Sequence, residues 1–365
     1  MTSARRSRSA SPGASFFTRE VSMLPPSRPV PGGGEPLPRK APAPARRRSG
    51  TMAPPCQSPG GATPMKFAVW PGPNDPWTET LAIARHAEAT GWDGVYYADH
   101  FMPNAADVSA PVSECWTTLA ALAAAVPRVR IGPLVTGNTY RHPAVLAKMA
   151  ATVDNISGGR LVLGLGAGWQ ENEHRAYGIE FSTVKGRLDR LEEACEVITS
   201  LFANRRTTFE GRYYRLEEAP LEPKPVQQPV PLLIGGGGER RTLRIAARYA
   251  NEWNTWGTPE VLAHKGRILD RHCEELGRDP RTIRRSAQAL LVMSDDPAVL
   301  ERVGRAGFPV LGGSPADLRA AVERYAEAGV HELIIPGFNL GRTLEEKLAV
   351  LDRFNEQVIS RVSRE

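Results

Sequence analysis

Cysteines and long apolar runs are scarce in this sequence. Four cysteines stand far apart among 365 residues and form no CxxC pair, so neither a disulfide scaffold nor a zinc module fits, and we predict no metal site. No run of 18 apolar residues occurs, which excludes a transmembrane helix and gives no reason to expect a membrane partner. We therefore expect a globular, cytoplasmic protein with reduced thiols. The cysteines are Cys56, Cys115, Cys195 and Cys273.

A general excess of positive charge is also missing once the chain is divided at residue 64. Residues 1–64 hold 10 Lys and Arg against 2 Asp and Glu, a net charge of +8, whereas residues 65–365 hold 36 against 38, a net charge of −2. The overall charge of +6 therefore comes from the first 64 residues. The remainder gives no electrostatic reason to expect a nucleic-acid partner.

The first 64 residues lack the side chains that build a core. They carry 13 of the 32 prolines, together with Gly32–Gly34 and Arg46–Arg48. Such a segment cannot offset the entropy lost on ordering, so we expect it to be disordered. A regular pattern begins at Met65, which favours translation from Met65 or Met52, with the tail a gene-calling artefact, over a basic arm that contacts an anionic partner.

From Met65 onward, apolar stretches alternate with helical patterns. The stretches expected as strands are residues 66–70, 94–98, 130–135, 160–165, 231–234, 251–255, 283–293 and 331–335. They are continuously apolar, as expected for strands that are covered on both faces. This alternation predicts an α/β fold in which residues 65–365 form a (β/α)8 TIM barrel. A doubly wound open sheet alternates in the same way, but the length and the number of strands favour the barrel.

Helix ends and two long connections complete the predicted arrangement. The predicted helix starts are Asp75-Pro76, Thr258-Pro259, Ser314-Pro315 and the capping box from Thr343 to Glu346, and the predicted ends are Gly91, Gly277 and Gly329. Two stretches are longer than the connections of a minimal barrel require. Residues 204–230 are predicted to form an insertion with a hairpin, and residues 100–116 form a long loop, which favours a functional role.

Two motifs follow the second and third predicted strands, at the end where a barrel carries its active site. Asp99-His100 ends the second strand, and a histidine there can exchange a proton near neutral pH, although an isolated pair is more often structural. Residues 136–138, Thr-Gly-Asn, follow the third strand and offer hydrogen-bonding groups beside a flexible glycine, although a plain loop has the same composition.

Two glycine-rich stretches follow the next strands. Residues 166–168, Gly-Ala-Gly, fail the dinucleotide fingerprint because Trp169 stands where the last glycine belongs. By themselves they allow either a ring to approach the backbone or simple close packing. Residues 235–238 are four glycines that enter a helix beside Arg240, where backbone N–H groups and the guanidinium favour phosphate binding over a plain turn.

Four tryptophans fall at the predicted strand ends, namely Trp70, Trp169, Trp253 and Trp256. Any one of them is most often a core residue. Four at one end of a barrel would form an apolar pocket for a flat cofactor or substrate.

Taken together, these segments resemble the luciferase-like monooxygenase superfamily, and within it the branch that uses the deazaflavin coenzyme F420. The matching stretches are residues 97–101, 136–143, 154–160, 164–169 and 235–238, in order and at family spacing. The resemblance implies a barrel with an insertion, a cofactor that lies across the strand ends, hydride chemistry on a small organic substrate, and a homodimer.

The resemblance also assigns roles by position. His100 matches the catalytic histidine that faces the reactive ring of the cofactor. Its neighbour Asp99 is our candidate to orient it, with a side chain that points into the barrel wall as the alternative. The residues matched to the cofactor site are Thr136, Gly137, Asn138, Gly166, Ala167, Gly168, Gly235, Gly236, Gly237, Gly238 and Arg240. Trp70, Asn104 and Trp169 are expected to shape the substrate pocket.

Two departures from the F420-dependent glucose-6-phosphate dehydrogenases bear on the substrate. Those relatives carry a tryptophan four residues after the histidine, where this chain has Asn104, and an acidic residue where it has Trp169. A sugar phosphate is therefore not the expected substrate. The sequence predicts an F420-dependent oxidoreductase. A reduced-FMN-dependent monooxygenase and a non-catalytic flavin-binding protein are the alternatives, because all three need the same ring pocket.

Overall fold

Parallel strands form the centre of the computed structural model, which describes residues 64–362. Neighbouring strands pair in the order β3-β2-β1-β13-β10-β9-β8-β5-β4. They are β1 (Lys66–Trp70), β2 (Gly94–Tyr97), β3 (Arg130–Pro133), β4 (Thr136–Gly137), β5 (Leu163–Gly166), β8 (Leu232–Gly235), β9 (Glu252–Trp256), β10 (Arg284–Gln288) and β13 (Glu332–Pro336). A parallel bridge between Ile131 of β3 and Leu161, just before β5, links the two sides of this order, so the barrel is nearly closed. The predicted (β/α)8 barrel is thereby confirmed.

The nine strands of this sheet occupy eight positions around the barrel. β4 continues β3 after the residues Leu134 and Val135, which are joined by a cis peptide bond. β3 pairs with β2, whereas β4 pairs with β5, so the interruption lies where the chain passes from one neighbour to the other. Val135 is thus brought to the carboxyl end of the strands.

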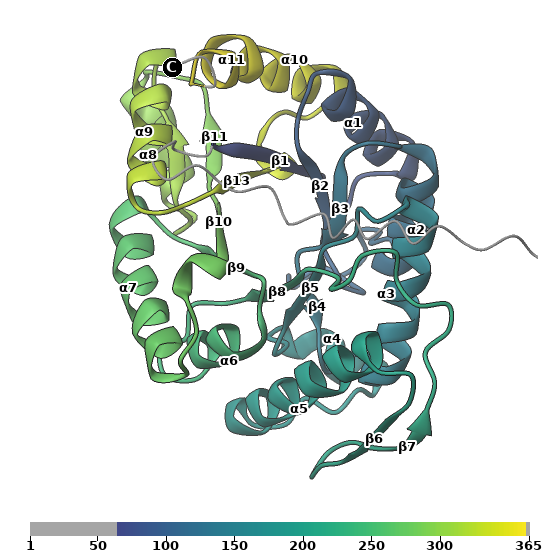
Figure 1. Cartoon of the computed structure of the whole chain (residues 1–365). Helices are drawn as coiled ribbons and strands as arrows, with labels where there is room; N and C mark the ends of the chain where they lie inside the picture. Colours follow the sequence, from purple (N-terminus) through teal and green to yellow (C-terminus); the bar gives the residue numbers. More distant parts are fainter. Residues whose placement is uncertain (1–63, 363–365) are drawn as a thin grey trace, which may run out of the picture. The chain divides into compact units, whose positions relative to one another are not determined.

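Helices alternate with the strands and surround them (Figure 1). They are α1 (Trp77–Ala89), α2 (Cys115–Ala125), α3 (Pro143–Ser157), α4 (Glu171–Tyr177), α5 (Val184–Ala203), α6 (Thr242–Tyr249), α7 (Pro259–Glu275), α8 (Pro297–Gly304), α9 (Pro315–Glu327), α10 (Leu344–Phe354) and α11 (Ser360–Val362). Within residues 64–362, none of them combines the length and apolar character that a membrane crossing requires.

Two apolar cores follow from the alternation of side chains along each strand. The larger core packs the outward-facing side chains of the strands against the helices, as Phe67 and Val69 of β1 do. The smaller core fills the barrel interior with Ala68, Tyr96, Leu134, Val162, Leu233 and Ile334. Trp70 and Val135 pack on this inner core, so they form part of the floor beneath the carboxyl end of the strands.

Most of the predicted helix boundaries are confirmed. Ser314 and Thr343 each form a capping box, and the three predicted end glycines follow the last turns of α1, α7 and α9. The start of α1 differs from the prediction, because Pro76 rather than Asp75 occupies the N-cap. Asp75 instead accepts a hydrogen bond from the Gly72 N–H and pairs with the buried Lys347.

The predicted insertion contains the expected hairpin, formed by β6 (Thr207–Glu210) and β7 (Arg215–Ala219). A second small sheet pairs β11 (Leu290–Val292) with β12 (Val310–Gly312) after β10. The predicted tail, residues 1–64, lies outside the described residues except for its last residue, so the expected disorder and alternative translation start stay predictions.

Candidate active site

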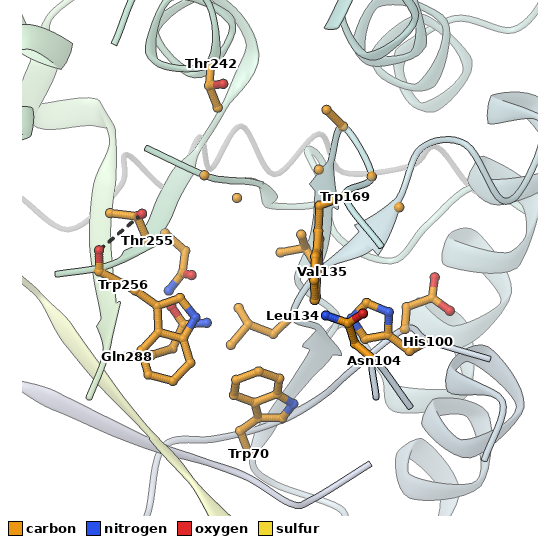
Figure 2. Close-up of a pocket in the computed structure, with 18 of the residues that line it drawn as sticks. Trp70, His100, Asn104, Leu134, Val135, Trp169, Thr242, Thr255, Trp256 and Gln288 are labelled. Carbon is orange, nitrogen blue, oxygen red and sulfur yellow. Dashed lines mark hydrogen bonds between the residues drawn. The ribbon is translucent and has the colours of Figure 1, made fainter. Parts of the chain in front are cut away.

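A cavity of about 710 Å³ opens at the carboxyl end of the barrel strands. It lies where the sequence places its candidate residues, and Figure 2 shows how their side chains surround it. The predicted residues that line it are Trp70, Asp99, His100, Asn104, Gly137, Gly166, Ala167, Gly168, Trp169, Gly235, Gly236 and Trp256. The structure therefore gathers at one cavity residues that lie far apart along the chain.

His100 presents one ring nitrogen to a carboxylate and leaves the other without a protein partner. Its Nδ1 lies 2.8 Å from Oε1 of Glu173, a fully buried residue of α4. A carboxylate only accepts hydrogen bonds, so Nδ1 carries the proton and a neutral His100 has its lone pair on Nε2. Within the described residues Nε2 has no hydrogen-bond partner, and His100 lines the cavity.

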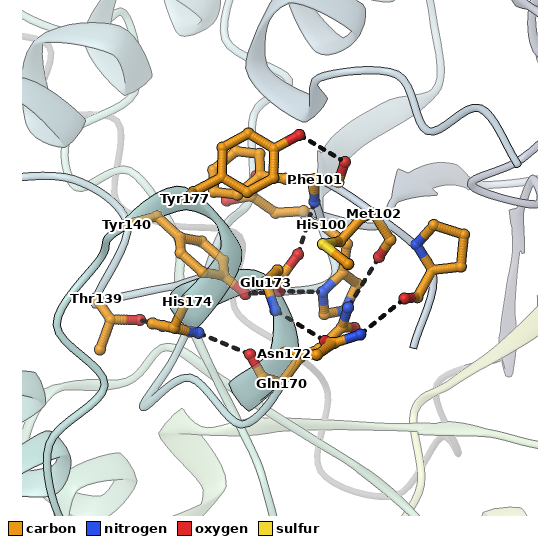
Figure 3. Close-up of polar contacts among 12 residues, drawn as sticks. His100, Phe101, Met102, Thr139, Tyr140, Gln170, Asn172, Glu173, His174 and Tyr177 are labelled. Atoms are coloured by element: carbon orange, nitrogen blue, oxygen red, sulfur yellow. Dashed lines mark hydrogen bonds and ion pairs between the residues drawn. The ribbon is translucent and has the colours of Figure 1, made fainter. Parts of the chain in front are cut away.

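Glu173 receives three donors (Figure 3). They are His100, the Phe101 N–H at 2.7 Å and the hydroxyl of Tyr140. Burial alone would raise the pKa of Glu173, but these hydrogen bonds outweigh it and hold that pKa below its ordinary value. Burial and the bond to Glu173 raise the pKa of Tyr140, which therefore stays a neutral phenol. The site thus holds a buried, ionised carboxylate directly behind the histidine.

The loop after β2 is tied to α4, which carries this carboxylate. Gln170 donates to the Met102 carbonyl at 2.8 Å, and Asn172 donates to the Pro103 carbonyl at 3.0 Å. These contacts fix the position of His100 relative to Glu173, and Figure 3 shows them side by side. Part of the long loop predicted to be functional is therefore held rigidly against the site.

The prediction that Asp99 orients His100 is wrong. Asp99 lines the cavity, but its carboxylate pairs with both terminal nitrogens of Arg141, at 2.6 and 3.1 Å. Arg141 also pairs with Glu114. Burial raises the pKa of Asp99, and Arg141 opposes that rise without cancelling it. The carboxylate that orients His100 is therefore that of Glu173, and Asp99 is held by Arg141.

The side chains of three other predicted residues do not line the cavity. Thr136 is buried and accepts a hydrogen bond from Trp116 at 2.9 Å, and Asn138 is buried and donates to Tyr214 at 3.2 Å. Trp253 is 1% exposed and donates to the Gly236 carbonyl at 2.9 Å. These side chains support the backbone around the cavity from behind, because they point away from it.

The glycines that line the cavity make room for Val135. A Cβ on Gly166 or on Gly235 would lie 2.8 Å from a methyl carbon of Val135, closer than such atoms approach. Gly137 has a similar constraint, because a Cβ there would lie 2.5 Å from the Tyr140 ring. The glycines therefore serve local packing, which the sequence left as an alternative, and they also leave backbone exposed to the cavity.

The four-glycine loop adjoins a second hollow of about 480 Å³, which shares Thr242 with the main cavity. Gly237, Gly238 and Arg240 line this hollow rather than the main cavity. Among the described residues, the N–H groups of Gly237 and Gly238 donate to no protein acceptor, and Arg240 makes no ion pair. Gly236 has φ of +119°, which requires glycine. The loop therefore offers free donors to an anion.

The sequence missed several cavity residues and the partner of His100. Glu173 lies in the polar run of residues 170–174 after the fourth barrel strand, and that run is the signal that could have found it. Gln288 is the last residue of β10, so its place at a strand end was available too. The other missed residues are Leu134, Val135, Tyr140, Thr242, Asn254, Thr255, Phe308 and Phe338.

Comparisons with known proteins place the chain in a family and identify similar proteins. The family model described as luciferase-like monooxygenase matches residues 48–332. An F420-dependent glucose-6-phosphate dehydrogenase of Kineococcus radiotolerans is 30% identical over 312 residues, which cover 72% of this chain and 89% of that protein. An F420-dependent hydroxymycolic acid dehydrogenase of Mycobacterium tuberculosis is 29% identical over 265 residues, or 72% of this chain and 71% of that protein.

A solved structure shares the fold. It is an F420-dependent secondary alcohol dehydrogenase in complex with an F420-acetone adduct, and it superposes with a TM-score of 0.73. The superposition covers 83% of this chain and 100% of that chain at 22% sequence identity.

Proposed function

Because this chain belongs to the luciferase-like monooxygenase family, we propose that it is an F420-dependent oxidoreductase that transfers a hydride between the coenzyme and a small organic substrate. The names of the similar glucose-6-phosphate and hydroxymycolic acid dehydrogenases support this choice of coenzyme. The observation that carries the proposal is His100, which faces the cavity with a free Nε2 while Glu173 holds its Nδ1.

The residues around the cavity fit a coenzyme that has a flat ring and a phosphate. The backbone of Gly166, Ala167 and Gly235 lines the cavity without bulky side chains and would lie against the ring. The free N–H groups of Gly237 and Gly238, with the guanidinium of Arg240, would hold the phosphate. When bound, coenzyme F420 supplies two-electron hydride chemistry.

His100 would move the proton that accompanies the hydride. Oxidation of an alcohol releases a proton from oxygen, and Nε2 of a neutral His100 can accept it. Glu173 then stabilises the imidazolium, because its carboxylate is already ionised and hydrogen-bonded to Nδ1. In the reverse direction the same nitrogen donates the proton. Glu173 is thus a positioning residue in this proposal, and His100 is the catalytic one.

The substrate would lie against the side chains that project into the cavity on the far side from the glycines. Trp70 and Asn104 line this part, and Trp169 packs edge-on against His100 with ring centroids 5.4 Å apart. Trp169 is 62% exposed, so it has free ring surface that a bound ligand could cover. Substrate and coenzyme together would then exclude water from Nε2 of His100.

Titration of the purified full chain with F420 and with FMN, following the fluorescence of each, tests the choice of coenzyme. We expect saturable, selective binding of F420. A Gly237→Val variant should lose this binding. Gly304→Val is a matched control, because a Cβ on Gly304 would have no neighbouring atom within 4 Å and this residue lies outside both hollows.

The same titration separates the alternatives. Selective binding of FMN, with oxygen uptake by the reduced complex, would replace the proposal with a monooxygenase. Coenzyme binding without turnover of any alcohol, aldehyde or activated alkene, in wild type and His100→Ala alike, would instead indicate a non-catalytic flavin-binding protein.

A further inference from the structure

Aromatic side chains form one wall of the cavity, and of these the proposed function uses only Trp70. Trp70 lies 5.9 Å from Phe338 and 6.1 Å from Trp256, and Trp256 lies 4.7 Å from Phe308, measured between ring centroids. Phe308 and Phe338 are 43% and 46% exposed, although large apolar side chains are costly to leave in water. This aromatic wall, defined as Trp70, Trp256, Phe308 and Phe338, therefore has free faces that an apolar ring could cover.

The cavity also lacks a group to neutralise an anionic substrate. Among the described residues that line it, none is Lys or Arg. Its acidic residue Asp99 is already paired with Arg141, and the ionised Glu173 lies directly behind His100. A phosphate in this space would lose its hydration without gaining a counter-charge, which is a large cost. The cavity therefore favours an uncharged substrate. Glucose 6-phosphate, the compound in the name of several similar dehydrogenases, is charged.

Two buried polar atoms of side chains that line the cavity have no partner in the described range, Nε1 of Trp70 and Oε1 of Gln288. Gln288 is 4% exposed, lines the cavity, and makes no side-chain hydrogen bond with any residue in the described range. It is the register partner of Trp256, so it stands beside the aromatic wall. Figure 2 shows Gln288 and His100 on opposite sides of the cavity, with Leu134 and Val135 between them. A buried amide without a partner is costly, and a ligand atom can satisfy it.

We propose that the substrate is an uncharged aromatic or alicyclic ring compound with polar groups at both ends. A hydroxyl or carbonyl group at the reacting carbon meets His100, and this part rests on the proposed function. The ring covers the aromatic wall. A second neutral polar group at the far end of the ring hydrogen-bonds to the amide of Gln288. Size, charge and polarity of the cavity thus select together against sugar phosphates and against small acyclic alcohols.

Binding of ketones to the protein loaded with oxidised F420 tests this substrate class by calorimetry. Ketone and coenzyme are then both oxidised, so no turnover disturbs the titration. The probes are acetone, acetophenone, 4′-hydroxyacetophenone and glucose 6-phosphate, at neutral pH. We expect acetophenone to bind at least about tenfold more tightly than acetone because of the buried ring. The added hydroxyl should improve binding by about threefold to tenfold. Glucose 6-phosphate should give no heat of binding.

Two variants assign these differences to their residues. Gln288→Leu should remove the advantage of 4′-hydroxyacetophenone while leaving the affinity for acetophenone unchanged. Phe308→Ala should weaken acetophenone but not acetone, and because Phe308 lies at an exposed edge its truncation should not impair folding. Gln357→Leu, in the C-terminal turn far from the cavity, is the matched control and should bind all four probes as the wild type does.

The outcomes separate this proposal from the proposed function. If the protein does not load with F420, the proposed function fails before any ketone is added. If it loads but glucose 6-phosphate binds as tightly as acetophenone, or acetone matches acetophenone, the substrate class is wrong while the coenzyme stands. An unchanged preference for 4′-hydroxyacetophenone in Gln288→Leu would overturn the contact to the amide.

Discussion

The two ends of the barrel each bury a glutamate beside a tyrosine, but they treat the carboxylate in opposite ways. At the carboxyl end of the strands, Glu173 accepts from Tyr140 and from two further donors, and its pKa is lowered. At the amino end, Glu332 accepts from Tyr96 at 3.2 Å, and its pKa is raised. Burial raises the pKa of both carboxyls. At Glu173 the three hydrogen bonds outweigh burial, whereas at Glu332 burial and the charge of Glu252 outweigh Arg130 and the single bond from Tyr96.

The amino end holds a closed charged cluster. Arg130 pairs with Glu252 and lies 3.7 Å from Glu332, so one guanidinium serves two buried carboxylates. Oε1 of Glu332 has no hydrogen-bond partner among the described residues. Burial raises the pKa of Glu332, Arg130 opposes the rise, and the charge of Glu252 adds to it. At the amino end the charged side chains contact one another. At the carboxyl end the hydrogen-bonded Glu173 lies behind His100, which faces the cavity.

We infer that the carboxyl end of the barrel serves the reaction and that the amino end serves stability. Replacing His100 should therefore lower turnover without impairing folding or coenzyme binding. We expect His100→Ala to lower turnover by about 10²–10⁴-fold, the usual loss for a general acid or base, with little change in coenzyme affinity. Steady-state kinetics and F420 fluorescence titration measure the two effects, with the exposed His264→Ala as control.

Asp99→Asn should cost less turnover than His100→Ala, because Asp99 contacts Arg141 rather than the imidazole. If His100→Ala binds F420 normally and keeps turnover near that of the wild type, His100 is a rim residue and the proposed mechanism fails.

At the amino end, Arg130→Leu should lower the free energy of unfolding by about 3–5 kcal/mol, because it leaves two carboxylates buried without their cation. Coenzyme affinity, measured under native conditions, should not change. Arg281→Leu, just before β10, is a matched control: both partners of its pair with Asp279 are exposed, so the change should stay within about 0.5 kcal/mol. Denaturant unfolding measures both. A loss of coenzyme affinity in folded Arg130→Leu would show that the two ends are coupled.

Substitutions in the four-glycine loop test whether coenzyme affinity can change at the carboxyl end without a change in stability. Gly237→Val should weaken coenzyme binding by about 1.5–3 kcal/mol for each lost hydrogen bond to phosphate, with little effect on melting temperature. Gly236→Val should weaken binding as well, and its φ of +119° should add about 1–3 kcal/mol of strain to the folded state. Equal melting temperatures for the two variants would contradict this distinction, and unchanged affinity in both would remove the phosphate role.

The sequence was sufficient to predict the barrel and most of the residues at its carboxyl end, because apolar strands and glycines leave local patterns. It could not predict which side chains face the cavity. Trp253 and Trp256 both lie near the end of one strand, yet they are three positions apart and so point to opposite faces. The partner of His100 lies 73 residues away on a helix, and its identity depends on how that helix is rotated.

The contrast between Glu173 and Glu332 also predicts opposite dependence on pH. A lowered pKa in the folded state means that the group contributes stability above its ordinary pKa of about 4.3, and that this contribution is lost as the pH falls. A raised pKa means that the folded state holds the proton more tightly than the unfolded state. Stability then falls as the pH rises from about 4.3 through the raised value.

Glutamine at each position removes these contributions. The stability of Glu332→Gln relative to wild type should therefore improve as the pH rises through that window. The stability of Glu173→Gln relative to wild type should worsen as the pH rises from the acid range to about 4.3 and above. A tenfold difference in proton affinity between the folded and unfolded states corresponds to about 1.4 kcal/mol across the series. Urea unfolding of the three proteins at a series of pH values measures both slopes. If the stability of Glu173→Gln relative to wild type also improved as the pH rose, the hydrogen bonds to Glu173 would not outweigh its burial.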